Sequence, residues 1–248
     1  MRKQSNIGHP KVTLLNRQIL LETLVSWCQA TVSWSPHIEH ITEVARKMAS
    51  WVLSAFRDRT PTVMLTLYKS LIRSRLEYCS PVWNLSKISD IQKLENIQRS
   101  FLRKIQGAHH LDYWERLKNL KIMSLQRRRE RYCIIQVWKI INDNAPNDIK
   151  MEFKTHPRLG VRATIPPMSN RAQPSVRTDY DCSFGVRAAQ LWNTLPAEIT
   201  RLQSLDSFKT GLGKFLEQYP DTPPVPRYTP FNDNSLLSWR KMHTMLKT

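Results

Sequence analysis

Residues 67–107 read LYKSLIRSRLEYCSPVWNLSKISDIQKLENIQRSFLRKIQG, and this stretch contains two helical patterns in succession. Apolar residues recur at steps of three and four as far as Cys79, which is the period of an amphipathic helix, and Pro81 is expected to end it. A second apolar stripe covers Ile91–Ile105, and Gly107 stands where the residue after a helix is often glycine. The stretch therefore predicts two consecutive helices.

The flanking sequence supports these helices and adds another before them. Thr60 and Pro61 are typical N-cap and first-turn residues for the first helix, and Ser89 with Gln92 forms a capping-box pattern for the second. Upstream, apolar residues again recur at helical steps, so we expect a helix with one buried stripe from residue 35 onward. The stripe residues are Ile38, Ile41, Ala45, Met48, Val52 and Ala55.

Two more helices are expected between residues 108 and 142. Asp112 and Glu115 form a capping-box pattern for a short helix. A longer helix is predicted from Ser124 to about Ile141, with a charged first half and an apolar second half. The apolar residues expected to face inward in the short helix are Trp114, Leu117 and Leu120.

The remainder of the chain has weaker patterns. Residues 143–182 lose all periodicity and contain several prolines, which predicts a linker or an extended arm. Two short helices are expected within residues 183–219, and residues 220–248 are expected to form an irregular tail. No strand pattern stands out, so the predicted fold class is mainly α: a helical bundle, then a proline-rich arm and short C-terminal helices.

Most aromatic residues fall on or beside the apolar stripes, and burial is expected for them. Tyr78 and Tyr113 leave base stacking open as an alternative. The tryptophans expected in the core are Trp51, Trp83, Trp114, Trp138 and Trp192.

The composition indicates a folded, strongly basic protein. Its 248 residues include 38 Lys and Arg against 20 Asp and Glu, a net charge of +18, which favours a polyanionic partner and nucleic acid over an anionic membrane. Neither a signal peptide nor a membrane span is evident in the sequence. The cysteines form no CxxC pair, which fits reduced thiols, and we expect an intracellular protein of the cytoplasm or nucleus. They are Cys28, Cys79, Cys133 and Cys182.

The sequence lacks the usual patterns of catalytic chemistry. Metal-dependent polymerases need clustered carboxylates, and no two acidic residues are adjacent; Asp179 and Asp181 come closest. The pairs His37/His40 and His109/His110 have no cysteine at ligand spacing, and no glycine-rich phosphate loop occurs. We therefore predict no catalytic, metal-binding or cofactor-binding residues, no cofactor, and no enzyme activity for the chain on its own.

Residues 99–131 contain ten Lys and Arg against three acidic residues. Arginines at the start of a helix oppose its dipole and repel one another, so their placement favours an anion opposite them. Phosphate groups would serve, although a charged face that only solvates the bundle is the alternative. The residues predicted to contact nucleic acid are Arg99, Arg103, Lys104, Arg127, Arg128 and Arg131.

Several motifs in register resemble the region after the polymerase core in reverse transcriptases of jockey-like non-LTR retrotransposons. The resemblance covers about residues 33 to 219, in preserved order and spacing. Its motifs are Ser33-Trp34-Ser35-Pro36-His37-Ile38, Leu76-Glu77-Tyr78-Cys79-Ser80-Pro81-Val82-Trp83, Leu94-Glu95-Asn96-Ile97-Gln98-Arg99-Ser100-Phe101, Leu191-Trp192-Asn193-Thr194-Leu195-Pro196 and Ser204-Leu205-Asp206-Ser207-Phe208-Lys209.

The resemblance implies that residues 33–107 are similar to a polymerase thumb, which cradles a template–primer duplex, and that the later helices are similar to the C-terminal region of the element's second reading frame. From its charge, the segment 108–142 is expected to be a basic helical extension. The family's catalytic hairpin is missing, and residues 1–32 depart from its pattern. We therefore expect a fragment that lacks the catalytic palm and binds the backbone of an RNA or DNA duplex. The alternatives are a helical module that docks on the rest of a reverse transcriptase, or on itself, through exposed apolar helix faces, and a decayed reading frame without a selected activity.

Overall fold

The computed structural model describes residues 34–80, 83, 87–142, 151–165, 183–222, 235–237 and 239, and in these residues the protein is mainly helical, as predicted. Residues 1–32, treated as a separate segment in the sequence, lie outside this part. The helices are α2 (Ser35–Ala55), α3 (Pro61–Leu67), α4 (Ser74–Glu77), α5 (Ile88–Leu102), α6 (Tyr113–Asn119), α7 (Leu125–Ile141), α9 (Phe184–Trp192), α10 (Ala197–Thr200) and α11 (Leu205–Glu217), and the strands are β1 (Phe153–His156) and β2 (Gly160–Ala163).

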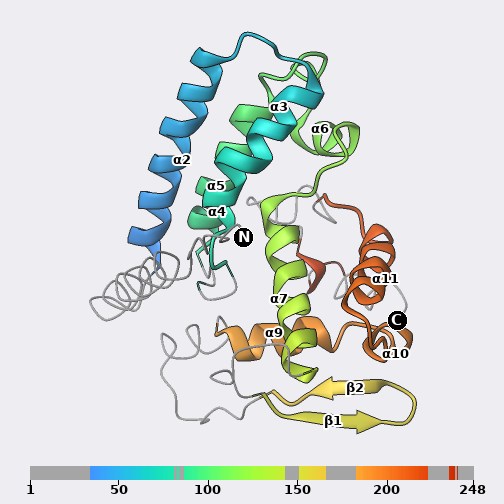
Figure 1. Ribbon diagram of the computed structural model, residues 1–248. Coiled ribbons are helices and arrows are strands. Elements are labelled where there is room, and N and C mark those ends of the chain that lie inside the picture. The colour runs from blue at the N-terminus through green and yellow to red at the C-terminus, as the bar shows by residue number, and fades with distance from the viewer. Residues whose placement is uncertain are drawn as a thin grey trace, which may run out of the picture.

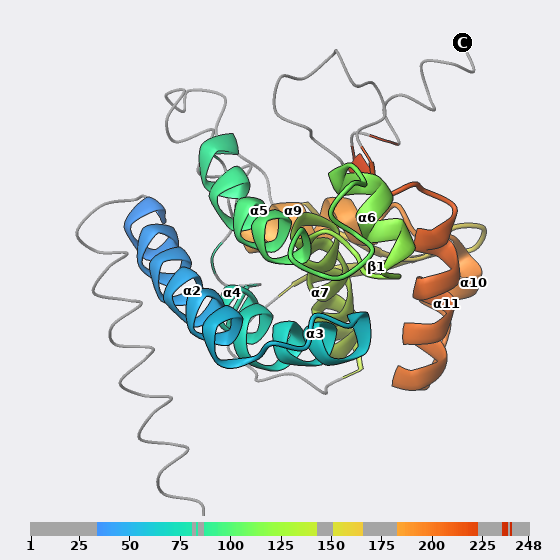
Figure 2. The ribbon, with the colours of Figure 1, turned by 90° about the horizontal axis from the view of Figure 1, so that it is seen from above.

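The elements are arranged around α7. In two perpendicular views, α2 lies at one edge of the molecule and α11 at the opposite edge, with α7 between them (Figures 1 and 2). The β1–β2 hairpin lies at the end of the molecule farthest from the α2–α3 loop (Figure 1). Among the described residues, no helix combines the length and apolar character needed to cross a bilayer.

The predicted stripe of α2 is confirmed except at its C-terminal end, where Ala55 is exposed. Ile38, Ala45 and Val52 are fully buried, and they belong to a hydrophobic core that α5 joins through Leu94 and Phe101. Removing such side chains from water supplies most of the stabilisation of this half of the protein.

The helix predicted from Pro61 toward Pro81 is shorter and less regular than expected. Pro61 is its first residue, as predicted, but the helix passes through a π-helical turn at Tyr68–Arg73 and ends at Glu77, before Pro81. The hydroxyls of Thr66, Ser70 and Ser74 each donate to the carbonyl four residues earlier, at 2.6–2.8 Å. Such bonds compete with the regular backbone pattern and bend helices.

The boundaries predicted for α5 are wrong at both ends. Its N-cap is Lys87, so Ser89 lies inside the helix and forms no capping box; Asp90 in the first turn instead accepts a bond of 2.6 Å from the Ser35 hydroxyl. The helix ends at Leu102, and Gly107 follows a further turn, with a left-handed φ of +77°.

The capping box predicted after residue 107 is confirmed, and the helix predicted from Ser124 begins at Leu125. The Asp112 carboxylate accepts the N–H groups of Trp114 and Glu115 at 2.6 and 3.0 Å, and Glu115 accepts the N–H of Asp112 at 3.2 Å. Ser124 is the N-cap of α7 and accepts the N–H of Arg127 at 3.1 Å. A negative group near a helix N-terminus also complements the helix dipole.

Helix α7 connects two hydrophobic cores. Leu117 and Leu125 belong to the first core, which therefore extends beyond residue 107. Ile134, Val137 and Trp138 belong to the second, together with residues of β2, α9, α10 and α11.

Two regions predicted to be irregular contain ordered structure. Within 143–182, β1 and β2 form an antiparallel hairpin that pairs Phe153 with Ala163 and His156 with Gly160. Within the predicted tail, Leu236 is fully buried in the second core, and its N–H donates to both Glu130 oxygens at 3.0 and 3.2 Å. Tertiary contacts hold both segments in place, so neither needs an apolar periodicity of its own that the sequence would show.

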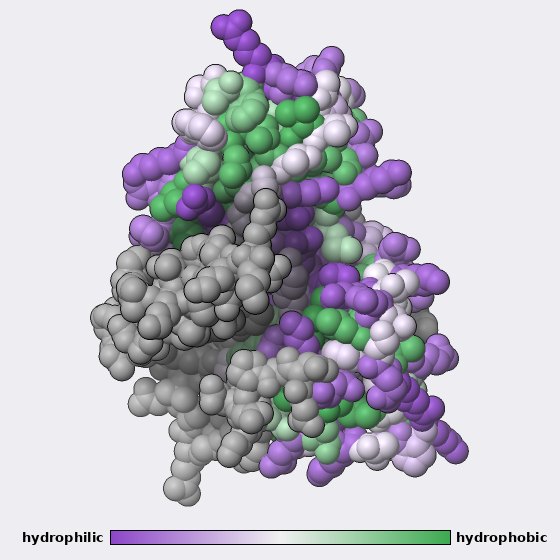
Figure 3. Space-filling view, viewed as in Figure 1, coloured by the Kyte–Doolittle hydropathy of each residue, from purple (hydrophilic) through white to green (hydrophobic). Residues whose placement is uncertain are grey.

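One tryptophan departs from the prediction of burial. Trp51 on α2 is 55% exposed, whereas Trp83, Trp138 and Trp192 are buried and Trp114 is half-buried. In the space-filling view, hydrophobic residues gather over α2 and α3 (Figure 3).

Candidate nucleic-acid interface

A basic hollow with a volume of about 790 Å³ lies at the C-terminal end of α5. None of the described residues that line it is acidic. They are Arg59, Ser100, Arg103, Lys104, Ile105, Gln106 and His109. Two of the residues predicted from the sequence, Arg103 and Lys104, therefore face the same opening.

The turn after α5 presents these cations because buried and exposed residues alternate along it. Ile105 and Ala108 are buried in the first core, while Arg103 and Lys104 are exposed. The left-handed conformation of Gly107, which glycine adopts without steric cost, lets the chain turn between the two anchors. The cations are thus displayed on a turn that packing holds in place.

Arg59 joins the hollow from the loop between α2 and α3. Its carbonyl accepts the N–H of Gln106 at 2.8 Å, which ties this loop to the turn after α5. Its guanidinium donates to the Leu53 carbonyl at 2.5 Å and remains half-buried in the lining of the hollow. Arg59 and His109 were not among the predicted contacts, because only the fold brings them beside Arg103.

A buried arginine adds positive charge beneath the surface. Arg116 donates from Nε to the Ala108 carbonyl at 2.8 Å and from Nη2 to the Leu111 carbonyl at 2.5 Å. Burial lowers the pKa of Arg116, and the positive charge of Arg103 lowers it further, while Asp112 opposes the change. The positive charges of Arg116 and Arg103 therefore repel each other, and an anion bound at the hollow would reduce this repulsion.

Arg99 lies one turn before the hollow. Its guanidinium carbon is 4.6 Å from the centroid of the Tyr113 ring, a cation–π contact, and its Nη1 donates to Asn96 at 3.2 Å. Tyr113 is itself buried, so it supports Arg99 and offers no open face for base stacking. Arg99, Arg103 and Lys104 thus form one continuous group at this end of α5.

The three predicted residues on α7 do not join this group. Arg127 is only 2% exposed, and its Nη2 donates to the Pro220 carbonyl at 3.3 Å. The prediction that it contacts phosphate disagrees with this burial. A side chain enclosed by the protein cannot reach a nucleic-acid backbone without unfolding of its surroundings.

Arg128 and Arg131 are also used within the protein. Arg128 forms a two-pronged ion pair with Glu77 of α4, with Nη2 to Oε2 at 2.9 Å, and donates to the Tyr132 hydroxyl at 2.5 Å. Arg131 donates to the Lys209 carbonyl of α11 at 3.4 Å, and burial lowers its pKa. These arginines connect α7 to its neighbours, so the six predicted residues do not form one surface.

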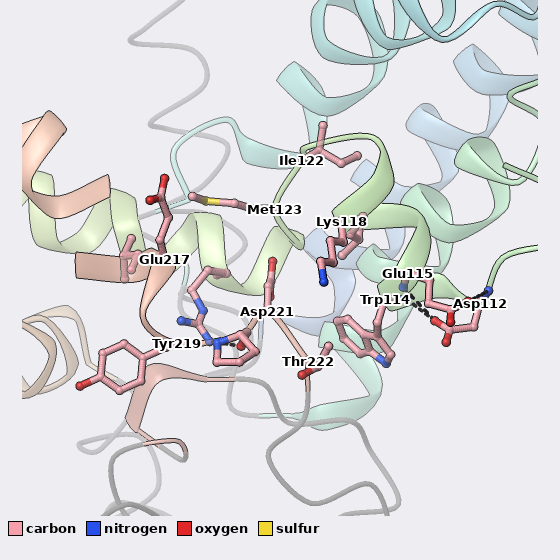
Figure 4. Close-up of a pocket in the computed structure, with 14 residues that line it drawn as sticks. Asp112, Trp114, Glu115, Lys118, Ile122, Met123, Glu217, Tyr219, Asp221 and Thr222 are labelled. Carbon is pink, nitrogen blue, oxygen red and sulfur yellow. Dashed lines mark hydrogen bonds between the residues drawn. The ribbon is translucent and has the colours of Figure 1, made fainter. Parts of the chain in front are cut away.

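A second hollow has the opposite character. A groove of about 750 Å³ lies between α6 and the residues around the end of α11, with Trp114 on the α6 side and Tyr219 on the other (Figure 4). Its lining is largely apolar and includes more carboxylates than exposed cations, which disfavours a polyanion. The carboxylates are Asp112, Glu115, Glu217 and Asp221.

Comparison with known proteins adds no assignment. No family model matches the chain, and no significant match is found among curated proteins or among solved structures. Within the described residues, no three His, Cys, Asp or Glu side chains come together in a way that could hold a metal ion. The basic hollow presents guanidinium, ammonium and imidazole groups, which are able to donate hydrogen bonds to an anion.

Proposed function

We propose that the protein binds the phosphate backbone of nucleic acid through the basic hollow. The observation that carries this proposal is the convergence of Arg59, Arg103, Lys104 and His109 on one opening whose described lining is free of acidic residues. A net charge of +18 supports a polyanionic partner. Such binding is driven by release of counterions and does not depend on base sequence.

The resemblance to the thumb and post-thumb region of non-LTR reverse transcriptases points to a template–primer duplex as the ligand. In that interpretation the chain is a fragment that holds a duplex and does not polymerise, because it lacks the adjacent carboxylates that bind catalytic metal ions. RNA–DNA hybrid and DNA duplex are the two ligands to compare.

The test is a salt titration of binding to fluorescein-labelled 20-base-pair duplexes, measured by anisotropy. Arg103→Ala/Lys104→Ala should lower the salt dependence, the slope of log K against log salt, by about 2 units, because each phosphate contact contributes roughly 0.9. Arg46→Ala/Lys47→Ala removes the same charge from the exposed face of α2 and should leave the slope nearly unchanged. Equal slopes for all three proteins would contradict the proposal.

A second candidate function is docking on another helical surface. It is supported by Trp51, which is 55% exposed on a helix, and by the hydrophobic residues gathered over α2 and α3 (Figure 3). Light scattering would detect self-association, which Trp51→Ser should abolish. Self-association without any change in duplex anisotropy would favour docking over nucleic-acid binding.

A further inference from the structure

The β1–β2 hairpin is fixed to the body of the protein by side chains from the end of α9. Asn193 Nδ2 donates to the Ala163 carbonyl at 2.9 Å, and its Oδ1 accepts the Ala163 N–H at 2.9 Å, so this side chain pairs with β2 as a further strand would. Trp192 Nε1 donates to the Val161 carbonyl at 3.0 Å. Two strands of four residues are marginal alone, and these bonds supply the missing support.

Further hydrogen bonds hold β2 and the turn of the hairpin. Arg162 Nη1 donates to the carbonyls of Asn193 and Leu195, both at 2.9 Å, and Arg201 Nη2 donates to the Pro157 carbonyl at 2.8 Å. Gly160 has a φ of +73°, and its backbone lies directly against Thr200 of α10. The hairpin is therefore a rigid projection from the end of the molecule (Figure 1).

The charges on the hairpin oppose its own stability. The strand register places Lys154 directly opposite Arg162, and like charges at such positions are destabilising. Arg158 adds a further cation in the turn. Neither Lys154 nor Arg158 takes part in an ion pair within the part of the chain that the structure describes. An external anion would offset the repulsion.

The tip combines these cations with an exposed apolar side chain. His156 Nδ1 accepts the N–H groups of Arg158 and Leu159 at 3.3 and 3.2 Å, which closes the turn. Leu159 is 49% exposed beside Arg158. Proteins that hold nucleic acid use cations against phosphates and apolar side chains against sugars and base steps.

We propose that the β1–β2 hairpin is a second nucleic-acid contact, with Lys154 and Arg158 on phosphates and Leu159 against the sugar or base surface. This inference rests on the proposed function and adds a contact far from the basic hollow, since the hairpin and the α2–α3 loop lie at opposite ends of the molecule (Figure 1). The bonds from Trp192, Asn193 and Arg201 hold the hairpin in its binding position, so little ordering entropy is lost on binding.

The experiment uses the full chain and the same 20-base-pair duplexes. Lys154→Ala/Arg158→Ala should lower the slope of log K against log salt by about 2 units and weaken binding at low salt about tenfold or more. Leu159→Ala should weaken binding without changing the slope, because it removes no charge. Lys209→Ala/Lys214→Ala, which removes the same charge from α11, should change neither quantity appreciably. Circular dichroism melting checks that each variant is folded.

The outcomes separate this inference from the proposed function. If Arg103→Ala/Lys104→Ala lowers the slope and Lys154→Ala/Arg158→Ala does not, the hairpin contact is wrong and the basic hollow stands. A loss of affinity equal to that of the α11 control would also overturn it, since the effect would then be one of net charge. If the unmodified chain does not bind either duplex, both proposals fall.

Discussion

Asp221 accepts hydrogen bonds from both the backbone N–H and the hydroxyl of Ser124, at 2.5 and 2.8 Å, across 97 residues of chain. Ser124 is the buried N-cap of α7. The helix that connects the two cores is therefore capped by a carboxylate from the segment after α11, which also places a negative charge at the positive end of the helix dipole.

Replacing Asp221 with alanine should lower the free energy of unfolding by about 1–2 kcal/mol, because the buried N–H of Ser124 loses its acceptor. Urea denaturation followed by circular dichroism measures this change. Glu217→Ala is the matched control: Glu217 is exposed in the last turn of α11, where a negative charge opposes the dipole, so its loss should be neutral or slightly stabilising. Equal effects would show that the cap contributes nothing.

Periodicity alone was enough to predict α2, α6, α7, α9 and α11, because each has an apolar face that must be buried. The capping box at Asp112 could also be predicted, since Asp112 and Glu115 are only three residues apart. Local patterns of this kind are contained within one turn of helix, which is why they can be recognised without a fold.

The roles of the α7 arginines could not be predicted from the sequence. An anion was expected opposite them, and for Arg128 that anion is a carboxylate of the same chain, Glu77, whereas Arg131 donates to a backbone carbonyl. Glu77 pairs with Arg128 across 51 residues of chain, and Asp221 caps Ser124 across 97 residues. Pairings over such distances leave no spacing in the sequence, so a buried structural arginine and a phosphate-binding one look alike there. The hairpin was missed for a related reason: its supports lie in residues 192–201.

The Arg128–Glu77 pair should contribute to stability and not to nucleic-acid binding. Both side chains are largely buried, so Arg128→Met should cost about 2 kcal/mol of unfolding free energy by leaving Glu77 with weaker partners. A double-mutant cycle with Glu77→Gln should give a coupling of about 1–3 kcal/mol. Arg75→Met, on the exposed side of α4, should cost less than about 0.5 kcal/mol.

The duplex titration distinguishes the two roles of Arg128. At a temperature where Arg128→Met remains folded, its salt slope should equal that of the unmodified chain. A slope lowered by about 1 unit would instead restore Arg128 to the binding surface.

Glu95 should make stability depend on pH. Its Oε2 accepts the Tyr113 hydroxyl at 2.5 Å and its Oε1 the Gln126 N–H at 2.7 Å. Burial raises the pKa of Glu95 above its ordinary value of 4.5, and the charge of Arg129 with these bonds opposes the rise only in part. The folded state therefore holds the Glu95 proton more tightly than the unfolded state.

Because the folded pKa is the higher one, the contribution of Glu95 is greatest below about pH 4.5 and is lost as pH rises through the folded pKa. Glu95→Gln does not titrate and serves as the reference. The unfolding free energy of the unmodified chain minus that of Glu95→Gln should fall from about pH 4.5 upward and then level off. Urea denaturation of both proteins across this range measures it, and a difference that grows with pH would show that the Glu95 pKa is lowered instead.

Cys133 should be chemically inert in the folded protein. Burial raises the pKa of its thiol from 9.0 to about 11, which reduces its thiolate population about 100-fold at pH 8. Iodoacetamide should therefore modify Cys133 only after urea is added, whereas the half-buried Cys79 should react in native conditions. Peptide mass mapping reports both sites, and rapid native labelling of Cys133 would mean that the second core opens readily.

Three glycines allow steric and conformational costs to be separated. Gly160 and Gly107 both have positive φ, but a methyl group on Gly160 would overlap the Thr200 hydroxyl and lie 3.2 Å from Ala197 Cα, whereas that on Gly107 would meet nothing within 4 Å. Gly107→Ala should cost about 1 kcal/mol from backbone strain alone, and Gly160→Ala at least about 2 kcal/mol because the hairpin must also move away from α10.

Gly213→Ala completes this series, because Gly213 lies inside α11 with open space around it and ordinary helical φ. It should stabilise the protein by about 0.5–1 kcal/mol, since alanine favours the helix. Urea denaturation ranks the three variants, and trypsin cleavage after Arg158 should accelerate only in Gly160→Ala, where the hairpin has left its support. If Gly160→Ala costs no more than Gly107→Ala and cleavage is unchanged, then the hairpin does not depend on close contact with α10, and its rigidity must come from the hydrogen bonds of Arg162, Trp192, Asn193 and Arg201.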